Sequence, residues 1–409
     1  MKALVLCGGI PQAALIRELK GRGIETVLAD MNEKVVARAY CDKFYTVSVL
    51  DVEAIKELAI KEKVDFLITV CADQVLLVVA QLSEELGLPC YIDYQTAENV
   101  SKKSYMKKIF WENGVPTSKY VEMDDFDEEK IKDLSYPLIV KPVDAYSSRG
   151  VQKVTNIEEA ERAFELAKNI SRTNSAIVEE FVEGDELTVD VYVENGIANV
   201  LSISNLYKIG EDGKFVIHRA QNPADISAEN EAKIKDAAQK IATAFGLVDT
   251  PMLIQLISTG EKISVIEFCA RTGGGVKFSM IKKVSGFDVV SAVVDLTLGI
   301  KPHYDEAKRP KTKYTINEFL YCKAGVLDRL EGFDELLNEG IIVEYHQFKS
   351  QGYEFKQINC SGDRVGYYSV EADTREEAWR KHDIANERIK ALSVNGEDLI
   401  RHDIVAKRK

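Results

Sequence analysis

The chain has 409 residues, of which 45% are hydrophobic, and a formal net charge of −13 at pH 7. This length and composition support buried cores in about two or three domains. The acidic balance argues against a nucleic-acid-binding face and against general attraction to anionic membranes, but it allows a local basic pocket for a phosphate ligand.

The seven cysteines are scattered, with no CxxC pair and no Cys/His cluster at zinc spacing. This usage is typical of reduced thiols in a cytoplasmic protein. The start of the chain, MKALVLCGG, has an apolar run too short for a signal peptide, and no uncharged stretch approaches the roughly 20 residues of a membrane helix. We therefore expect a cytoplasmic protein without nucleic-acid or membrane partners.

The first hundred residues alternate between strand and helix patterns. Strands are predicted at 3–7, 24–29, 44–49 and 65–70, and helices at 11–22, 51–63 and 74–86. Fully apolar strands linked by helices indicate a parallel sheet covered on both faces.

The turn after the first strand invites a second interpretation. Gly8 and Gly9 precede Pro11, and Asp30 is placed like an acid that binds a ribose in dinucleotide-binding folds. The complete glycine fingerprint is missing, so a tight strand-to-helix turn in an open sheet is the favoured interpretation.

From residue 99 the pattern changes to mixed elements. Helices are predicted at 102–113, 156–171, 229–245 and 287–299, and strands at 136–142, within 175–193 on both sides of Gly184, and at 195–205, 251–258 and 262–269. The charged, proline-bearing segment 304–313 marks a further boundary. Residues 366–389 then predict a strand, a capped turn and an amphipathic helix, which indicates a small α+β domain. We predict domains at 1–98, 99–303 and 304–409.

The stretch VIEFCARTGGG, 265–275, carries the densest chemistry. Alternation along a strand places Val265, Glu267, Cys269 and Arg271 on one face, with Ile266 and Phe268 toward the core. Gln255 on the preceding strand could join Glu267 as an oxygen ligand of Mg²⁺, and Arg271 could bind a phosphate. The glycines at 273–275 would admit a ligand to the backbone. A buried Glu267–Arg271 ion pair followed by an ordinary glycine turn explains this stretch equally well.

Other segments favour the ligand-binding interpretation. Lys141 ends a buried strand, where an ammonium group needs a partner such as a phosphate. The small residues of 144–151 suit a flap over phosphates, or a plain solvent loop. The carboxylates in IVEEF (177–181) and GDE (184–186) suit an adenine amino group and ribose hydroxyls, or a solvated acidic turn.

Taken in order, these segments resemble the ATP-grasp superfamily of carboxylate–amine ligases, which includes L-amino acid ligases and the large subunit of carbamoyl-phosphate synthase. The resemblance covers about the first three hundred residues and rests on IPQAALIRELKGRGIETVLAD, SKKSYMKKIFWENGVPT, YPLIVKP, SSRGV, IVEEFVEGDE and VIEFCAR. It implies an α/β and α+β fold: a parallel α/β domain, an ATP-grasp domain with a central lid at about 118–186, and a small C-terminal domain.

The resemblance also implies a nucleotide site. The ATP phosphates would contact Lys103 and Lys141, under a flap made by Ser147, Ser148 and Gly150. Adenine would lie against Glu179, Glu180, Phe181 and Val182, and the ribose against Glu186. Gln255 and Glu267 would bind Mg²⁺, for which Mn²⁺ can substitute, and Arg271 with Lys141 would neutralise the transferred phosphate.

Two positions depart from the family pattern, and others stay open. The family often has Glu at the position of Gln255 and Asn at that of Cys269. A thiol is a poor Mg²⁺ ligand, so we expect Glu267 to hold the main ion and a second ion to bind weakly. His218 or Arg219 could contact the acceptor substrate, with Gly273 and Gly274 nearby, but a surface histidine is the simpler expectation for His218.

The expected activity is ATP-dependent joining of a small-molecule carboxylate to an amine through an acyl phosphate, with an amino acid or peptide-like substrate. A homodimer is compatible with this. The alternatives are a bicarbonate-activating enzyme similar to carboxylases or carbamoyl-phosphate synthase, and a nucleotide-binding regulatory protein without turnover. Gln255 and Cys269 favour the regulatory alternative, whereas Lys141, Glu267 and Arg271 argue against it.

Overall fold

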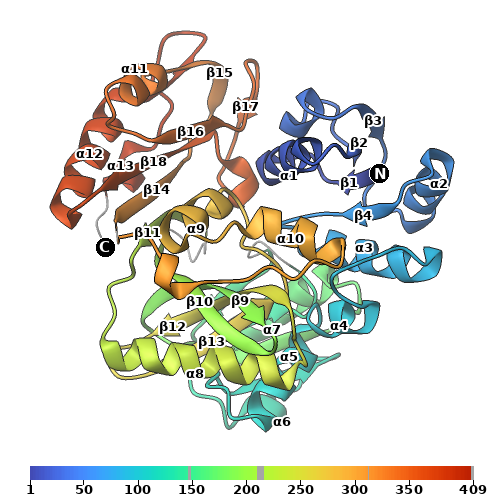
Figure 1. Cartoon of the computed structure of the whole chain (residues 1–409). Helices are drawn as coiled ribbons and strands as arrows, with labels where there is room; N and C mark the ends of the chain where they lie inside the picture. The colour runs from blue at the N-terminus through green and yellow to red at the C-terminus, as the bar shows by residue number, and fades with distance from the viewer. Residues whose placement is uncertain (146–148, 210–215, 312, 407–409) are drawn as a thin grey trace.

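The computed structural model of the chain describes residues 1–145, 149–209, 216–311 and 313–406 (Figure 1). The first hundred residues form a four-stranded parallel sheet in the order β3-β2-β1-β4. Its strands are β1 (Lys2–Leu6), β2 (Glu25–Asp30), β3 (Lys43–Thr46) and β4 (Phe66–Ile68), and its helices are α1 (Ile10–Gly21), α2 (Val52–Glu62), α3 (Asp73–Leu86) and α4 (Tyr94–Asn99). The predicted parallel α/β domain is confirmed.

Both faces of this sheet are covered, as predicted, but one covering helix comes from far along the chain. Helices α2 and α3 pack on one face, and α1 packs on the other together with α10 (Val289–Thr297). Val290 and Val293 of α10 are buried there, and Asp295 accepts a hydrogen bond from Arg22 at 2.6 Å. The helix predicted at 287–299 is almost entirely apolar, and the tertiary structure shows which surface buries it.

A second, smaller sheet lies between residues 120 and 180. It is antiparallel, in the order β5-β8-β6-β7, and its strands are β5 (Tyr120–Met123), β6 (Leu138–Pro142), β7 (Gln152–Val154) and β8 (Ala176–Glu180). Helix α7 (Ile157–Ile170) covers one face, and α6 (Glu128–Ile131) lies nearby in the same core. The Asn156 side chain caps α7 by accepting from the Glu159 N–H, at the start of the helix predicted over 156–171. We call this unit the lid sheet.

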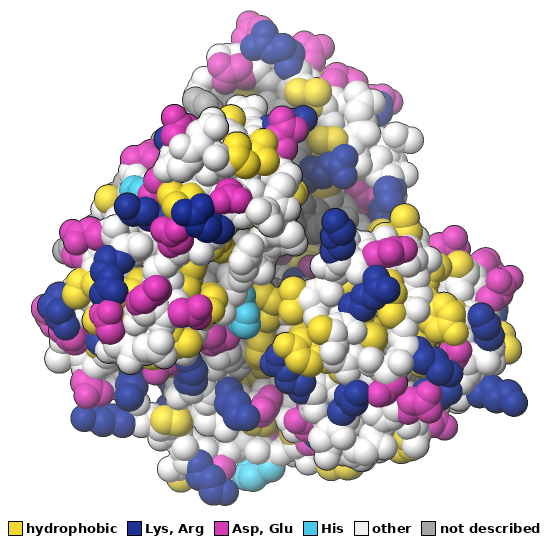
Figure 2. Space-filling view, turned by 90° about the horizontal axis from the view of Figure 1, so that it is seen from above, with side chains coloured by type: hydrophobic (Ala, Val, Ile, Leu, Met, Phe, Trp, Pro, Cys, Tyr) yellow, Lys and Arg dark blue, Asp and Glu magenta, His cyan; other side chains and the backbone are white. Residues whose placement is uncertain are grey.

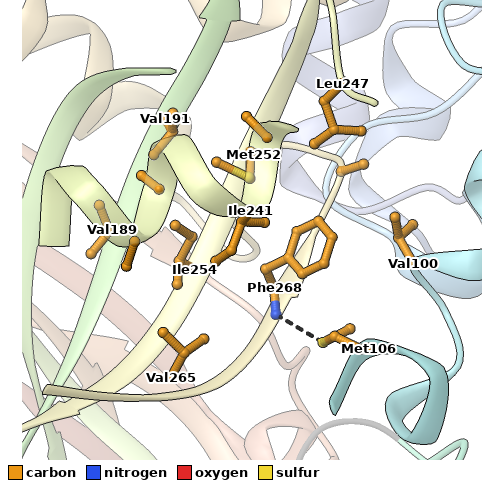
Figure 3. Packing of buried hydrophobic residues seen from close by; sticks show 14 of the residues in the cluster. Val100, Met106, Val189, Val191, Ile241, Leu247, Met252, Ile254, Val265 and Phe268 are labelled. Atoms are coloured by element: carbon orange, nitrogen blue, oxygen red, sulfur yellow. Dashed lines mark hydrogen bonds between the residues drawn. The ribbon is translucent and has the colours of Figure 1, made fainter. Parts of the chain in front are cut away.

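The largest sheet has eight antiparallel strands in the order β13-β12-β9-β10-β11-β14-β18-β16. The strands are β9 (Asp185–Glu194), β10 (Ile197–Lys208), β11 (Ile217–Asn222), β12 (Thr250–Ser258), β13 (Ile263–Cys269), β14 (Tyr314–Leu320), β16 (Glu344–Gln347) and β18 (Gly366–Ala372). Helices α5 (Lys103–Glu112) and α8 (Ala228–Ala244) cover one face, while α9 (Lys277–Ser285) packs against β10. Figure 3 shows Ile241, Ile254 and Phe268 in the core under α5 and α8.

The C-terminal residues continue this sheet. β14 pairs with β11 and β18 pairs with β14, so the sheet runs across the boundary predicted at residues 303 and 304. The same region adds a three-stranded sheet of β15 (Gly325–Glu331), β17 (Glu354–Phe355) and β19 (Lys390–Ser393), with helices α11 (Phe333–Asn338), α12 (Arg375–Arg388) and α13 (His402–Val405). Short 3-10 helices occur at Val36–Ala39, Glu306–Lys308 and Ser361–Asp363. Among the described residues, no helix combines the length and the apolar composition needed to cross a bilayer.

Candidate active site

A cavity lies between the lid sheet, helix α5 and the β9–β12–β13 end of the large sheet. Nine of the residues predicted from the sequence line it: Lys103, Lys141, Glu179, Glu180, Phe181, Val182, Glu186, Gln255 and Glu267. Apolar side chains, among them Ile139, Val151, Ile257 and Ile266, form another part of the wall. The molecular face in Figure 2 mixes acidic and basic side chains and is hollowed near its centre, with Lys and Arg side chains on the rim. The cavity therefore offers cations, carboxylates and apolar surface together.

Helix α5 is fixed against β13 by buried contacts. Met106 accepts a hydrogen bond from the Phe268 N–H at 3.3 Å (Figure 3). The ring of Phe110 packs at 5.9 Å from that of Phe268. One turn before Met106, the Lys103 Nζ donates to the Ala145 carbonyl at 2.7 Å and lies 3.2 Å from Glu267 Oε2. Burial opposes the charged form of Lys103, but the Glu267 carboxylate outweighs burial and raises the pKa of the lysine.

Glu267 and Gln255 face one another on adjacent strands, as the metal-site prediction required. The register pairs Gln255 with Glu267 but Leu256 with Val265, so Ile266 is an extra residue in a β-bulge. The side chains of Val265 and Phe268 are buried in the core cluster, whereas those of Ile266 and Glu267 are half-buried at the cavity, whose wall Val265 also reaches. The predicted placement of Val265 on the ligand face and Ile266 in the core is wrong, because the bulge reverses the alternation of side chains.

The side-chain oxygens of Glu267 and Gln255 suit a Mg²⁺ ion that takes most of its ligands from a bound nucleotide and water. Within the described part of the chain, no group of three or more His, Cys, Asp or Glu side chains could hold a metal ion. Glu267 and Gln255 supply one carboxylate and one amide oxygen. Mg²⁺ commonly takes one or two protein oxygens and completes its shell with phosphate oxygens and waters, so these residues fit that ion.

Lys141 and Glu179 meet on neighbouring lid strands, and a residue that the sequence analysis did not single out completes their cluster. Glu179 Oε1 lies 2.5 Å from the Nζ of Lys141, and Glu179 Oε2 lies 2.7 Å from the Nζ of Lys107. All three side chains are at most 8% exposed. Burial alone would raise the pKa of Glu179, but the two ammonium groups lower it to about 2. The MKK segment contained Lys107, but only the fold shows that it points inward.

The segment after Glu179 is held by its backbone and by further ion pairs. Glu180 accepts from the Ser135 N–H at 3.0 Å, and the Phe181 N–H donates to the Pro137 carbonyl at 3.0 Å. Glu186 forms an ion pair with Lys208, which also lines the cavity and was not predicted. Sequence reasoning missed Lys208 because it lies on β10, in a segment with no nucleotide-binding pattern.

Two glycines near the cavity are required by close packing. A Cβ at Gly184 would lie 2.5 Å from the Ser258 carbonyl oxygen, which keeps the connection from the lid sheet close to β12. Gly150 has a φ of +76°, and a Cβ there would lie 2.7 Å from the side chain of Ile170. Its neighbours Arg149 and Val151 line the cavity. Ser147 and Ser148, predicted with Gly150 as a flap, lie outside the described residues.

Arg271 does not line the cavity and does not pair with Glu267. Its guanidinium binds both carboxylate oxygens of Asp73 at 2.5 Å, at the start of α3, and donates to the Thr272 carbonyl at 2.6 Å. Burial opposes the charge of Arg271, but Asp73 raises its pKa further above the usual range. The alternative Glu267–Arg271 ion pair is absent, because each side chain has a different partner. Arg271 joins the parallel α/β domain to the end of β13.

The glycine run also has a different neighbour from the one expected. A Cβ at Gly273 would lie 2.9 Å from Asp190 Oδ1 and 3.1 Å from the Lys277 side chain, whereas one at Gly274 would meet nothing within 4 Å. Lys277 and Asp190 form a buried ion pair at 2.7 Å. Gly273 therefore makes room for a protein ion pair, and Gly274 leaves open space.

The expectation of a surface position for His218 is wrong. His218 is 1% exposed and Arg219 is fully buried, because β11 is an interior strand of the large sheet. Both bind Glu318 on β14: His218 Nδ1 lies 2.9 Å and Arg219 Nε 2.5 Å from its carboxylate, and His382 of α12 lies 3.0 Å away. Neither His218 nor Arg219 lines the cavity, although the preceding Ile217 does.

Asp30, considered as a ribose-binding acid, is used within the first domain. Its carboxylate accepts from the Gly8 N–H at 2.8 Å and from the Asn32 N–H at 2.8 Å. These bonds support the interpretation of Gly8 and Gly9 as a strand-to-helix turn.

Comparison with known proteins gives two family matches. Residues 134–279 match the ATP-grasp domain, and residues 318–391 match the L-amino acid ligase C-terminal domain 2. The formate-dependent phosphoribosylglycinamide formyltransferase of Pasteurella multocida is 28% identical over 254 residues, covering 60% of this chain and 63% of the relative. The alanine–anticapsin ligase of Bacillus subtilis is 29% identical over 244 residues, covering 53% and 51%. The chain thus spans less than two thirds of the length of these relatives.

Solved structures show the same fold over nearly the whole chain. An L-amino acid ligase from Bacillus licheniformis superimposes with a TM-score of 0.81 at 20% identity, covering 96% of this chain and 98% of that structure. The biotin carboxylase domain of the Hydrogenobacter thermophilus 2-oxoglutarate carboxylase, in complex with MgADP, ADP and bicarbonate, gives 0.80 at 18% identity, covering 100% and 94%. The predicted combination of α/β and α+β domains is confirmed by these matches.

Proposed function

Since the chain carries an ATP-grasp domain and an L-amino acid ligase C-terminal domain, we propose that it is an ATP-dependent ligase that joins a carboxylate to an amine. The observation that carries this proposal is the convergence of Lys103, Lys141, Glu186 and Glu267 on one cavity, from α5, the lid sheet, β9 and β13. These positions are spread over more than 160 residues of sequence, so their meeting indicates a site built for a large polar ligand.

We propose that the cavity binds ATP with its triphosphate toward Lys103 and Lys141. Both lysines line the cavity, and Lys103 already forms an ion pair with Glu267 on β13. The adenine would lie against the apolar side chains of Phe181 and Val182, with Glu180 and the backbone there offering polar contacts. The ribose would approach Glu186, whose partner Lys208 shares the cavity wall.

Gln255 and Glu267 would hold the Mg²⁺ that accompanies ATP, and Mn²⁺ could replace it. When bound, such an ion neutralises phosphate charge and orients the phosphate that is transferred. Because Lys103 now contacts Glu267, we expect that lysine to shift toward the phosphates when metal–nucleotide enters.

The proposed reaction has two steps. A substrate carboxylate attacks the γ-phosphorus of ATP, the bond to the β-phosphate oxygen breaks, and ADP leaves while an acyl phosphate forms. An amine then attacks the acyl carbon, phosphate leaves, and the amine loses a proton to give an amide. No protein nucleophile is required, so the chain contributes positioning and charge neutralisation, chiefly by Lys141. Closure of the lid sheet would keep water from the acyl phosphate. Arg271 would act on the same phosphate only if it released Asp73.

An amino acid or a peptide-like molecule is the substrate class that we propose first. The match of residues 318–391 to an L-amino acid ligase domain and the similarity to an alanine–anticapsin ligase support it. The second candidate is a bicarbonate-activating enzyme, which the fold shared with a biotin carboxylase domain favours. A regulatory protein without turnover is the third candidate, and Gln255 and Cys269 favour it.

We propose in addition that the protein is cytoplasmic and forms a homodimer. Size-exclusion chromatography with light scattering tests the dimer.

The decisive experiment measures phosphate release from Mg–ATP across a matrix of amino acids, other small carboxylates, amines and bicarbonate. Release that requires one carboxylate and one amine, and that Glu267→Gln abolishes, would support the ligase and name its substrates. Release with bicarbonate alone would favour the carboxylase-like candidate. Tight ATP binding without release for any pair would contradict the ligase proposal and favour the regulatory protein.

A further inference from the structure

The lysine behind the cavity wall has no role in the reaction proposed above. Lys107 is 1% exposed and, unlike Lys141 and Glu179, does not line the cavity. It lies on α5 one turn after Lys103, and the neighbouring Met106 holds this part of the helix against Phe268 (Figure 3). Its position is therefore fixed by the core and does not depend on a ligand.

The hydrogen bonds of Lys107 are saturated within the protein. Its Nζ lies 2.7 Å from Glu179 Oε2, and it donates to Thr117 Oγ1 at 2.6 Å and to Ser118 Oγ at 3.0 Å. An ammonium group has three donors, and these three acceptors use all of them. Thr117 in turn donates to the Val265 carbonyl at 2.8 Å, which ties the cluster to β13. Lys107 has no donor left for a nucleotide.

Lys141 differs in each of these respects. It lines the cavity, and its Nζ makes one hydrogen bond within the described part of the chain, to Glu179 Oε1. Two of its three donors are therefore available to a ligand. To bind a phosphate well, however, Lys141 has to give up part of its attraction to Glu179.

The charges buried around Glu179 show how Lys141 can turn from Glu179 to a phosphate. Two ammonium groups and one carboxylate are buried together, and the Ser118 Oγ donates to Glu179 Oε2 at 3.0 Å. Burial lowers the pKa of Lys107, Glu179 opposes that change, and Lys141 adds to it. If Lys107 were absent, a departing Lys141 would leave Glu179 as a buried carboxylate without a counterion, which is strongly unfavourable.

We propose that Lys107 is a positioning residue that neutralises Glu179 in place of Lys141 and so frees the Lys141 ammonium for the phosphates of the nucleotide. The inference rests on the proposed function, since it presumes a nucleotide in this cavity. It assigns Glu179 to the two lysines and leaves adenine recognition to the segment from Glu180 to Val182.

The test is calorimetric titration of the full-length protein with Mg–ADP, which needs no turnover. Lys107→Met keeps an unbranched side chain only one atom shorter and removes the charge. We expect it to weaken binding by at least about tenfold at about pH 8, and by clearly less at about pH 6, because a buried carboxyl that has lost Lys107 and yielded Lys141 to the ligand takes up a proton more readily at the lower pH. Lys107→Arg should retain most of the affinity. Lys108→Met is the matched control, because that neighbouring side chain is 66% exposed, and it should bind as the wild type does.

The double variant Lys107→Met with Glu179→Gln distinguishes the proposed positioning role of Lys107 from a general structural effect of the substitution. Removing both charges should restore binding to within a few-fold of the Glu179→Gln single variant, because no buried carboxylate is left without a partner. A loss that is equal at both pH values and unchanged in the double variant would overturn the inference, as would wild-type affinity in Lys107→Met.

Two further results keep the outcomes separate. If Lys107→Met does not fold in a thermal unfolding assay, Glu179→Gln alone decides: it frees Lys141 and should bind Mg–ADP at least as well as the wild type, and a tenfold loss would overturn the inference. If the wild type binds no Mg–ADP, the proposed function itself fails. If the wild type binds and only the lysine variants behave otherwise than expected, the inference alone fails.

Discussion

Two buried carboxylates in this molecule both lie among cationic side chains, but one is next to the cavity and the other is enclosed by protein on all sides. Glu179 lies between Lys107 and Lys141, and Glu318 lies among Arg219, His218 and His382. In both, burial would raise the pKa of the carboxyl, but the neighbouring cations and hydrogen-bond donors lower it to about 2. The Glu179 cluster forms part of a cavity wall, whereas the Glu318 cluster is sealed.

The difference shows that a buried ion cluster is by itself no indication of a ligand site. Glu318 is fully buried and joins β11, β14 and α12, so its partners are committed to holding the C-terminal elements on the large sheet. Lys141 instead retains donors that face the cavity. We therefore expect changes at Glu318 to affect stability and changes at the Glu179 cluster to affect nucleotide binding and turnover.

The largest expected effect is on turnover and comes from a change in the Glu179 cluster. Lys141→Met should lower the rate of ATP-dependent phosphate release on the order of a thousandfold, because it removes a cation that the proposed reaction places on the phosphates. Steady-state kinetics with the substrate pair found in the matrix measures it. Lys132→Met, on the lid with a 60% exposed side chain, is the control and should retain full activity. An active Lys141→Met variant would refute the phosphate role.

The next effect concerns stability in the sealed cluster. Glu318→Gln leaves the Arg219 guanidinium buried without its carboxylate, and we expect a loss of about 3 to 5 kcal/mol in the free energy of unfolding. Denaturant unfolding measures this loss. The folded variant should bind Mg–ADP as the wild type does, since neither side chain lines the cavity. Unchanged stability combined with weakened nucleotide binding would contradict the assignment of the Glu318 cluster to stability.

The pH dependence of stability follows from the same carboxylates. The pKa of Glu318 is about 2 in the folded protein and 4.5 in its reference state, so its contribution is present above about pH 4.5 and is lost as the pH falls toward 2. This contribution is on the order of 3 kcal/mol. Unfolding curves of the wild type and Glu318→Gln should therefore converge as the pH falls below about 4.5. Parallel curves over this range would show that Glu318 keeps its ordinary pKa.

The smallest expected effect concerns the proposed Mg²⁺ site at Gln255 and Glu267. Cys269→Asn supplies an amide oxygen where a thiol is a poor Mg²⁺ ligand, so the Mg²⁺ concentration required for half-maximal phosphate release should fall a few-fold. Cys41→Ser, in the first domain, is the control. If neither metal affinity nor turnover changes in Cys269→Asn, the idea of a weakened second metal position is wrong.

Much of the cavity lining could be predicted because its residues lie in segments with recognisable order and chemistry. Lys141 ends a buried strand, and Glu267 interrupts an apolar one, and both line the cavity. The ion-pair partners of the site residues could not be predicted in the same way. Lys107 resembled any lysine of an amphipathic helix, and Asp73, which binds Arg271, lies 198 positions before it.

The sequence by itself determined the succession of elements and the kinds of chemical group available. Strand and helix periodicity, the cap at Asn156 and the order of the motifs depend on local interactions, which a single chain segment already contains. Only the tertiary structure decided which charges neutralise one another. The bulge at Ile266 turned Val265 inward, and interior strand pairing buried His218, because side-chain direction depends on the register of neighbouring strands and ion pairing depends on distances between segments far apart in the chain.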